Sequence, residues 1–226
     1  MGDAPAYEDA FSTSHVFKLT TTNRLMIADF LDGLSEEQWR GPTLCDGWDV
    51  HTMAAHFLQP MLVGFGRFFV TALRYRGDTD RVVDHTTRRL ARHNRQEILR
   101  LLRAHADDQV DPPRVGPMGP FAETCIHLRD IARPMGSEAD VPTDHWTALL
   151  DYMVHPRAAA AIVAPGTLNG LRLRATDAAW SAGTGVEITG TAEALGMAAS
   201  GRRHALADLD GPGAELLGMR YKSPAN

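Results

Sequence analysis

The sequence predicts a mainly α-helical protein that ends in a small α/β domain. Over residues 8–163, apolar side chains recur at helical spacing in several long or medium stretches. Later in the chain, residues 171–175 alternate apolar and charged side chains, as a half-buried strand does. A length of 226 residues suits a medium domain and a small one. We therefore predict a helical domain over residues 1–165 and an α/β domain over residues 166–226.

Composition and charge narrow the class of protein. The net charge is −5, and no basic stripe is interleaved with aromatic residues, which argues against nucleic-acid binding. No run approaches the roughly 20 apolar residues that a membrane span needs, and the N-terminus does not resemble a signal peptide. We therefore expect a cytoplasmic protein without a membrane partner, in which Cys45 and Cys125 stay reduced.

Two helices are expected before residue 40. Residues 8–31 carry apolar side chains at helical spacing, and Gly33 marks the end of that helix. Residues 1–7 are expected to be a frayed end. Ser35 and Gln38 have the spacing of a capping box, which predicts that a short helix begins there.

Three longer helical patterns follow. One helix is expected over residues 50–74, where Pro60 allows a kink. The next is expected over residues 79–106, with apolar residues on one face and arginines on the other. A last long helix is expected over residues 146–163. Four long or medium helices joined in this way are typical of a bundle.

The stretch from Glu123 to Pro134 carries the strongest candidate site. It is expected to form a short helix that ends before Pro134. Glu123 and His127 are four residues apart, so both side chains leave one face of that helix. A carboxylate and an imidazole at this spacing can share one divalent metal ion. The pair needs a third ligand from elsewhere, and His56 is the best candidate.

His51 is the rival of His56 for that third position. On a regular helix, five residues place the two side chains roughly 140° apart, so both cannot bind the same ion. His56 lies roughly 100° around the helix from the apolar Phe57, which fits a side chain that points into a cleft between helices. Cys45 and Cys125 are interpreted as packing residues rather than ligands.

Two strands and a helix are expected in the C-terminal domain. The strands are residues 171–175 and 186–190, and residues 182–185 carry a turn signal between them. Residues 191–199 are rich in alanine and are expected to be helical. Residues 202–219 are expected to form a further helix or a short strand.

Three parts of the chain resemble one known family. Residues 39–56 resemble the N-terminal signature of the mycothiol-dependent maleylpyruvate isomerase family, which belongs to the DinB-like metalloenzymes; the matching residues include Trp39, Pro42, Cys45, Gly47, Trp48, Asp49 and His56. Glu123, His127, Asp130, Arg133 and Pro134 resemble its second signature. Residues 170–202 resemble its C-terminal domain. These three parts occur in the same order as in the family, and together they span most of the chain.

This resemblance implies a fold, a metal and a cosubstrate. The fold is a DinB-like four-helix bundle followed by a small domain of sterol-carrier-like type. The metal, usually zinc, is held by residues that correspond to His56, Glu123 and His127. The cosubstrate is the low-molecular-weight thiol mycothiol. The namesake of the family isomerises maleylpyruvate to fumarylpyruvate, and many members act in other pathways.

Such a site predicts chemistry on an electrophilic small molecule. Three protein ligands leave a fourth zinc position open, where a thiol loses its proton. The thiolate can then isomerise a double bond or be transferred to the substrate. Arg202 is the candidate for binding an acidic substrate, and Asp130 is the candidate for orienting His127.

Three alternatives to this prediction stay open. The chain can be a non-catalytic module that binds a small molecule or has a regulatory role on the same fold. It can also be a hydrolase in which water occupies the open position. Finally, a set of two histidines and a glutamate also accepts nickel, iron or manganese.

Overall fold

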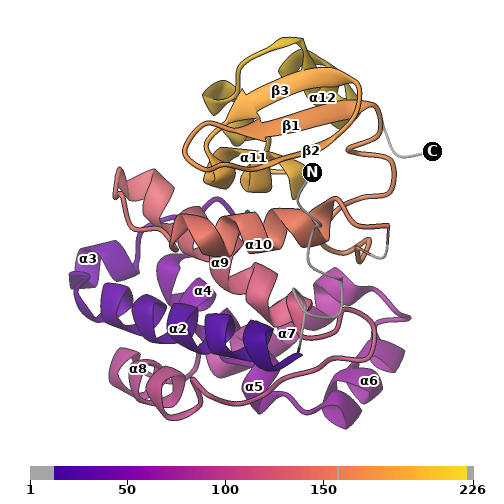
Figure 1. Ribbon diagram of the computed structural model, residues 1–226. Coiled ribbons are helices and arrows are strands. Elements are labelled where there is room, and N and C mark those ends of the chain that lie inside the picture. The colour runs from indigo at the N-terminus through magenta and orange to yellow at the C-terminus, as the bar shows by residue number, and fades with distance from the viewer. Residues whose placement is uncertain (1–12, 157, 223–226) are drawn as a thin grey trace. The chain divides into compact units, whose positions relative to one another are not determined.

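The computed structural model describes residues 13–156 and 158–222 and divides the chain into two compact units (Figure 1). One unit comprises residues 13–140 and is helical; the described part of the other comprises residues 141–222 and holds a three-stranded sheet. The predicted class, mainly helical with a small sheet, is confirmed. The predicted domain boundary at residue 165 stays a prediction. None of the described helices combines the length and the apolar character needed to cross a membrane.

The first unit is built from helices joined by short turns. Its elements are α2 (Thr13–Asp32), α3 (Glu36–Trp39), α4 (Val50–His56), α5 (Gln59–Leu62), α6 (Phe65–Arg74), α7 (Thr79–Leu90), α8 (Arg95–Ala104), α9 (Met118–Ala132) and the 3-10 turn η1 (Arg133–Met135). Helix α9 packs against α2 and α4, and most of its residues are buried. Its less buried side chains are Glu123, His127 and Arg129, and of these Glu123 and His127, which are one turn apart, share one face.

Several helix ends lie where the sequence predicts them. Helix α2 ends at Asp32, directly before Gly33. The capping box at the start of α3 is confirmed, because Gln38 N donates to Ser35 Oγ at 3.2 Å while Ser35 N donates to Gln38 Oε1 at 2.8 Å. Helix α9 ends before Pro134, which lies in η1. Residues 1–7, which were expected to be frayed, lie outside the described residues.

The helix predicted over residues 50–74 is wrong in its continuity, because the structure has three helices there. Helix α4 ends at His56, and Pro60 lies in the first turn of α5, where its missing N–H group costs no hydrogen bond. Gly64 then precedes α6 with an extended backbone. His56 is thereby the last residue of a short helix rather than a mid-helix residue.

The helix predicted over residues 79–106 is also two helices. Helix α7 ends at Leu90, and α8 begins at Arg95. Asn94 starts the second helix, since its side-chain oxygen accepts a hydrogen bond from Glu97 N at 2.9 Å. An N-cap of this kind requires non-helical backbone at the cap residue itself, so the helix is interrupted there. The apolar periodicity of the sequence does not reveal this interruption.

Polar groups in the core fix α2 against α9. Asn23 is fully buried, and its amide donates to Thr124 Oγ1 at 2.9 Å and to Cys125 Sγ at 3.5 Å. The neighbouring Arg24 is also buried, and it donates to the carbonyl oxygens of Ala106 and Asp108. Because buried polar groups are stable only when they are paired, the bonds of Asn23 set the position of α9 along α2, and those of Arg24 hold the segment after α8 against α2.

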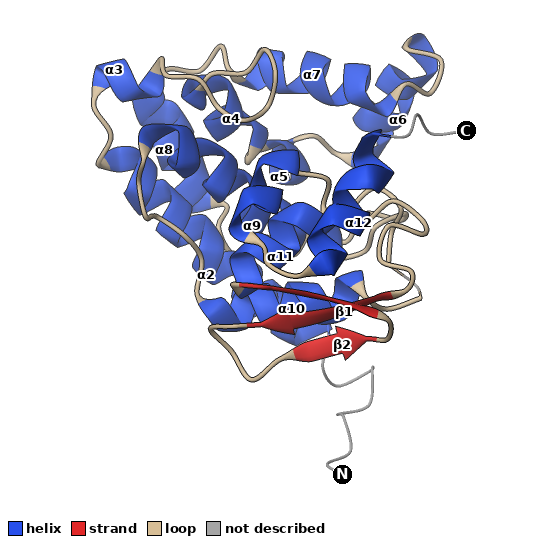
Figure 2. Ribbon diagram, turned by 90° about the horizontal axis from the view of Figure 1, so that it is seen from above, coloured by secondary structure: helices blue, strands red, loops and turns tan. Residues whose placement is uncertain are grey.

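The second unit packs helices against its small sheet. Its elements are α10 (Thr143–Met153), β1 (Leu171–Ala175), β2 (Ser181–Gly183), β3 (Val186–Gly190), α11 (Ala192–Ala199), the 3-10 helix η2 (Arg203–Asp208) and α12 (Pro212–Lys222). The strand order is β2-β1-β3, with β1 antiparallel to β2 and parallel to β3. Figure 2 shows the three strands as one sheet, and α11 packs on β1, β3 and α10.

Two predictions in this unit need correction, and the further helix or short strand predicted over residues 202–219 is confirmed as helical. The helix predicted over residues 146–163 spans Thr143–Met153 instead, since Pro156 follows its end. The sequence predicts two strands, but Ala182 and Gly183 of the expected turn belong to β2, which is too short to show alternation. Residues 202–219 contain a 3-10 helix and most of α12, together with one isolated bridge between Thr189 and Asp210.

The contact between α10 and α11 gives a prediction about stability. A Cβ atom added at Gly196 of α11 would lie 2.7 Å from the indole ring of Trp146, which is 1% exposed. We expect Gly196→Ala to lower the free energy of unfolding by about 1–3 kcal/mol, because a packed ring must move. The matched control is Gly218→Ala in α12, whose added Cβ meets only Leu206 at 3.5 Å. Denaturant unfolding of both variants checks this, and equal stability of the two would contradict it.

Candidate metal site

His127 is held by a buried carboxylate one turn further along α9. Its Nδ1 lies 2.9 Å from Asp130 Oδ2, and the Asp130 side chain is fully buried. Because an ionised carboxylate only accepts hydrogen bonds, the proton of the neutral ring lies on Nδ1. Nε2, on the other side of the ring, is then the nitrogen that can bind a metal. The predicted contact is therefore present, while the role of Asp130 in activity stays a prediction.

His56 brings a second imidazole to the same place. The ring centroids of His56 and His127 are 5.0 Å apart, and the rings meet nearly edge to face at 82°. His56 is 3% exposed; its Nδ1 lies 3.3 Å from Thr87 Oγ1, and the Trp48 ring lies 5.0 Å away. Burial and the nearby charge of His127 lower the pKa of His56 well below its usual range. His56 is therefore neutral at pH 7, which is the form that binds a metal.

Glu123 lies one helical turn before His127 and is half-buried. Burial raises the pKa of its carboxyl group, while the charges of His127 and Arg24 act in the opposite direction. Within the described part of the chain, no side chain or backbone group donates a hydrogen bond to this carboxylate. A half-buried carboxylate of this kind, one turn from the imidazole of His127, suits a cation.

Cys45 also lies at this site, which the sequence interpretation as a packing residue does not anticipate. Its Sγ lies 3.5 Å from Asp130 Oδ2 and 3.9 Å from His127 Nδ1. Cys45, His127 and Asp130 thus each offer a ligand atom within 4.8 Å of the others. The loop between α3 and α4, which carries Cys45, is anchored to α9, because Leu44 N donates to the backbone oxygen of Asp130 at 2.9 Å. No periodicity links a loop residue to a helix about 80 residues away, so spacing alone could not find this contact.

The remaining candidates lie elsewhere. His51 Nε2 lies 2.9 Å from the carbonyl oxygen of Ala91, so the rival of His56 contacts another part of the unit. Cys125 is fully buried, and burial raises the pKa of its thiol, so it is a core residue. Arg202 belongs to the second unit, where its guanidinium donates to the carbonyl oxygen of Ser200 at 3.2 Å. Its predicted role in substrate binding stays a prediction.

Comparisons with known proteins identify the family of the chain. The family model described as mycothiol maleylpyruvate isomerase N-terminal domain matches residues 24–156, a range that includes His56, Glu123 and His127. Two similar solved structures are crystal structures of the mycothiol-dependent maleylpyruvate isomerase and of one of its histidine-to-alanine mutants. A search of curated proteins finds no match.

The structural likeness extends over most of both chains. The mutant structure is 14% identical with a TM-score of 0.53, and the other is 12% identical with a TM-score of 0.52. Each comparison covers 84% of this chain and 89% of the solved one. At this identity the likeness establishes a shared fold, whereas the family model covers more than half of the sequence. The chain therefore belongs to the mycothiol-dependent maleylpyruvate isomerase family.

Proposed function

We propose that this protein is a metal-dependent enzyme that uses mycothiol as a thiolate on an electrophilic small molecule. The observation that carries the proposal is the convergence of His56 and His127, whose ring centroids are 5.0 Å apart, with Glu123 one turn away on α9. Membership of the family supports thiol-dependent isomerisation as the first choice of reaction. S-transfer by the same thiolate is the second.

The donor set fits a catalytic metal. His56, Glu123 and His127 would hold the ion, and two histidines with one glutamate form a common set of three ligands at catalytic zinc sites. When bound in this way, a divalent metal lowers the pKa of a coordinated thiol, so that thiolate is present at neutral pH. Zinc is our first choice, and nickel, iron and manganese also accept this set.

Residues around the proposed ligands keep them in a binding form. Asp130 fixes the ring of His127 through Nδ1. Thr87 contacts His56 Nδ1, and the rings of Trp48 and Phe57 lie against the two imidazoles. The buried Phe57 ring and the half-buried Trp48 ring limit the access of water to one side of the site, which strengthens charge interactions there.

The reaction itself balances without a redox step. The mycothiol sulfur adds to one carbon of an activated double bond, and the electrons of that bond move to the activating carbonyl group. The former double bond is now single and rotates. The same electrons then return, the carbon–sulfur bond breaks, and the trans alkene and the thiolate are released. In S-transfer the carbon–sulfur bond is kept instead, and the enolate takes up a proton from solvent on carbon, so that no group has to leave. We propose that Arg202 binds a carboxylate of the substrate.

A second metal arrangement shares His127 with the first. Cys45, His127 and Asp130 also place their ligand atoms within 4.8 Å of one another. It would use Nδ1 of His127, which Asp130 contacts, whereas the first uses Nε2. A cobalt-substituted protein separates them, because a cysteine ligand gives a thiolate charge-transfer band before any thiol is added. We expect no such band, and we expect the spectrum of Cys45→Ser to match that of the parent.

We further infer the domain types from the family. The helical domain, residues 1–165, is proposed to be a DinB-like four-helix bundle, and residues 166–226 a sterol-carrier-like domain. A cytoplasmic location suits a reduced thiol cosubstrate. A non-catalytic binding or regulatory module on the same fold is the alternative, and the presence of all three proposed ligands argues against it.

Metal removal tests the proposed function. After treatment with a chelator, turnover of a cis-configured electrophile such as maleylpyruvate with mycothiol should stop, and adding zinc should restore it. The reaction should also need the thiol, because the protein itself supplies no nucleophile in this scheme. Turnover that persists without metal would contradict the proposal, and turnover without thiol would favour a hydrolase. Bound metal without turnover of any electrophile would favour the binding module.

A further inference from the structure

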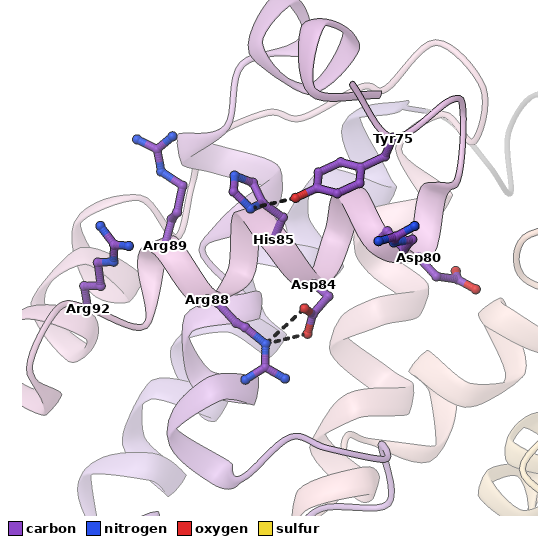
Figure 3. Close-up of a pocket in the computed structure, with 8 residues that line it drawn as sticks. Tyr75, Asp80, Asp84, His85, Arg88, Arg89 and Arg92 are labelled. Atoms are coloured by element: carbon purple, nitrogen blue, oxygen red, sulfur yellow. Dashed lines mark hydrogen bonds and ion pairs between the residues drawn. The ribbon is translucent and has the colours of Figure 1, made fainter. Parts of the chain in front are cut away.

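A second charged site lies on α7, apart from the proposed metal ligands. It is a cleft of about 490 Å³ whose lining includes Arg81, Arg88, Arg89 and Arg92 (Figure 3). Its acidic lining residues are Asp80 and Asp84, so four cationic and two anionic side chains give a local charge of +2. The whole chain carries −5. The cleft is therefore positive on a protein that is negative as a whole.

One end of the cleft is held by an ordered chain of contacts. The guanidinium of Arg81 lies 5.4 Å from the centroid of the Tyr75 ring, and the Tyr75 hydroxyl lies 3.1 Å from His85 Nδ1. Arg81 is in the first turn of α7, where the helix dipole disfavours a cation. The stacking on Tyr75 compensates for that effect and keeps the cation at the cleft.

In the middle of the cleft, one arginine is already neutralised. Arg88 Nε lies 2.9 and 3.0 Å from the two carboxylate oxygens of Asp84, which also accepts a hydrogen bond from Trp48 Nε1 at 2.9 Å. Figure 3 shows the Arg88–Asp84 pair on one side of α7. Asp84 therefore cannot neutralise the arginines that follow.

The other end carries two arginines without a protein counter-charge. Arg89 and Arg92 are exposed, and neither side chain makes a hydrogen bond or ion pair with any residue in 13–156 or 158–222. They are three residues apart, so their positive charges are close. Arg100 and Arg103 on the neighbouring α8, by contrast, each pair with a carboxylate. The dipole of α7 favours positive side chains at its C-terminal end, which accounts for the presence of arginines there. It does not account for their position in the lining of a cleft.

We propose that this cleft binds a small anion that carries at least two phosphate or carboxylate charges. Its volume lies within the range of small-molecule sites, roughly 300–1,000 Å³. Arg89 and Arg92 supply fork-shaped donors for one anionic group, and Arg81 supplies a third donor at the opposite end. The proposal does not rest on the proposed thiol chemistry, and none of the lining residues is a proposed metal ligand.

Titration calorimetry with two probes tests this site. The probes are tripolyphosphate and citrate at low ionic strength, and the proteins are the full-length chain and Arg89→Gln/Arg92→Gln. We expect the parent to bind at least one probe with one-to-one stoichiometry, and the variant to bind it at least tenfold more weakly. The probe that binds more tightly identifies phosphate or carboxylate as the ligand class.

A variant with the same change in charge is the control. Arg40→Gln/Arg100→Gln removes two exposed arginines outside the cleft, and it should bind the probe like the parent. Equal weakening in both double variants, or no binding to the parent at millimolar probe, would overturn the proposal. Tighter binding of a single-stranded oligonucleotide than of either probe would overturn it too, in favour of a nucleic-acid surface. Metal content and thiol turnover should be unchanged in both variants.

Discussion

Replacing His127 by alanine should remove bound metal and thiol-dependent turnover together. In the proposed site His127 supplies one of three ligands, and the two that would remain, His56 and Glu123, cannot hold a zinc ion in a tetrahedral site as tightly. We expect about one metal ion per chain in the parent and almost none in the variant. Activity should fall by more than about 100-fold, which is the upper end of the effect of losing only an outer-shell partner. Elemental analysis and a turnover assay on the same samples check this.

Alanine substitutions at His56 and His51 show whether the same test is specific for the proposed ligands. Both residues are on α4, but His56 faces His127, while His51 contacts the carbonyl oxygen of Ala91. His56→Ala should therefore lose metal as His127→Ala does, and His51→Ala should keep both metal and activity. If His51→Ala loses the metal and His56→Ala retains it, the choice of ligand is wrong. If His127→Ala is metal-free and fully active, the metal has no part in the reaction.

Local signals in the sequence predict the helix ends that are fixed by capping side chains or by a glycine. The capping box of Ser35 and Gln38 and the glycine after Asp32 act within one turn, so their residue types specify the geometry. The breaks at residues 57–64 and 91–94 were missed because apolar periodicity continues across them. A short turn between two helices can leave the apolar stripe in register, and then only the caps show the break.

The residues of the candidate site also fall into those that sequence spacing predicts and those that it does not. Glu123, His127 and Asp130 lie on one helix, so their spacing predicts that they are neighbours, and His127 and Asp130 are in contact. His56 was identified by its flank position and by family resemblance, since no spacing connects residues on two helices. Cys45 and Thr87 were not identified, because their approach depends on how a loop and α7 pack on the other helices.

Asp130→Asn should weaken metal binding without unfolding the protein. Asparagine has nearly the same shape, and its side-chain oxygen can still accept the proton of His127 Nδ1, but it carries no charge. Partners of this kind raise the basicity of the ligand and fix its orientation, and their loss reduces metal affinity by about 10–100-fold. The backbone oxygen of Asp130 would still accept the hydrogen bond from Leu44. Competition with a chromophoric chelator measures the affinity.

The chain contains a matched control for that substitution. His105 and Asp108 are also three residues apart, and Nδ1 to Oδ2 is again 2.9 Å, but neither residue is a proposed ligand. Asp108→Asn changes the charge by the same amount, so it should leave metal affinity at the parental value. An equal loss in both variants would mean that overall charge, rather than the contact with His127, sets the affinity. A loss confined to Asp130→Asn would support a role for the contact with His127. The cobalt spectrum of Cys45→Ser then separates an outer-shell Asp130 from the arrangement in which Asp130 is itself a ligand.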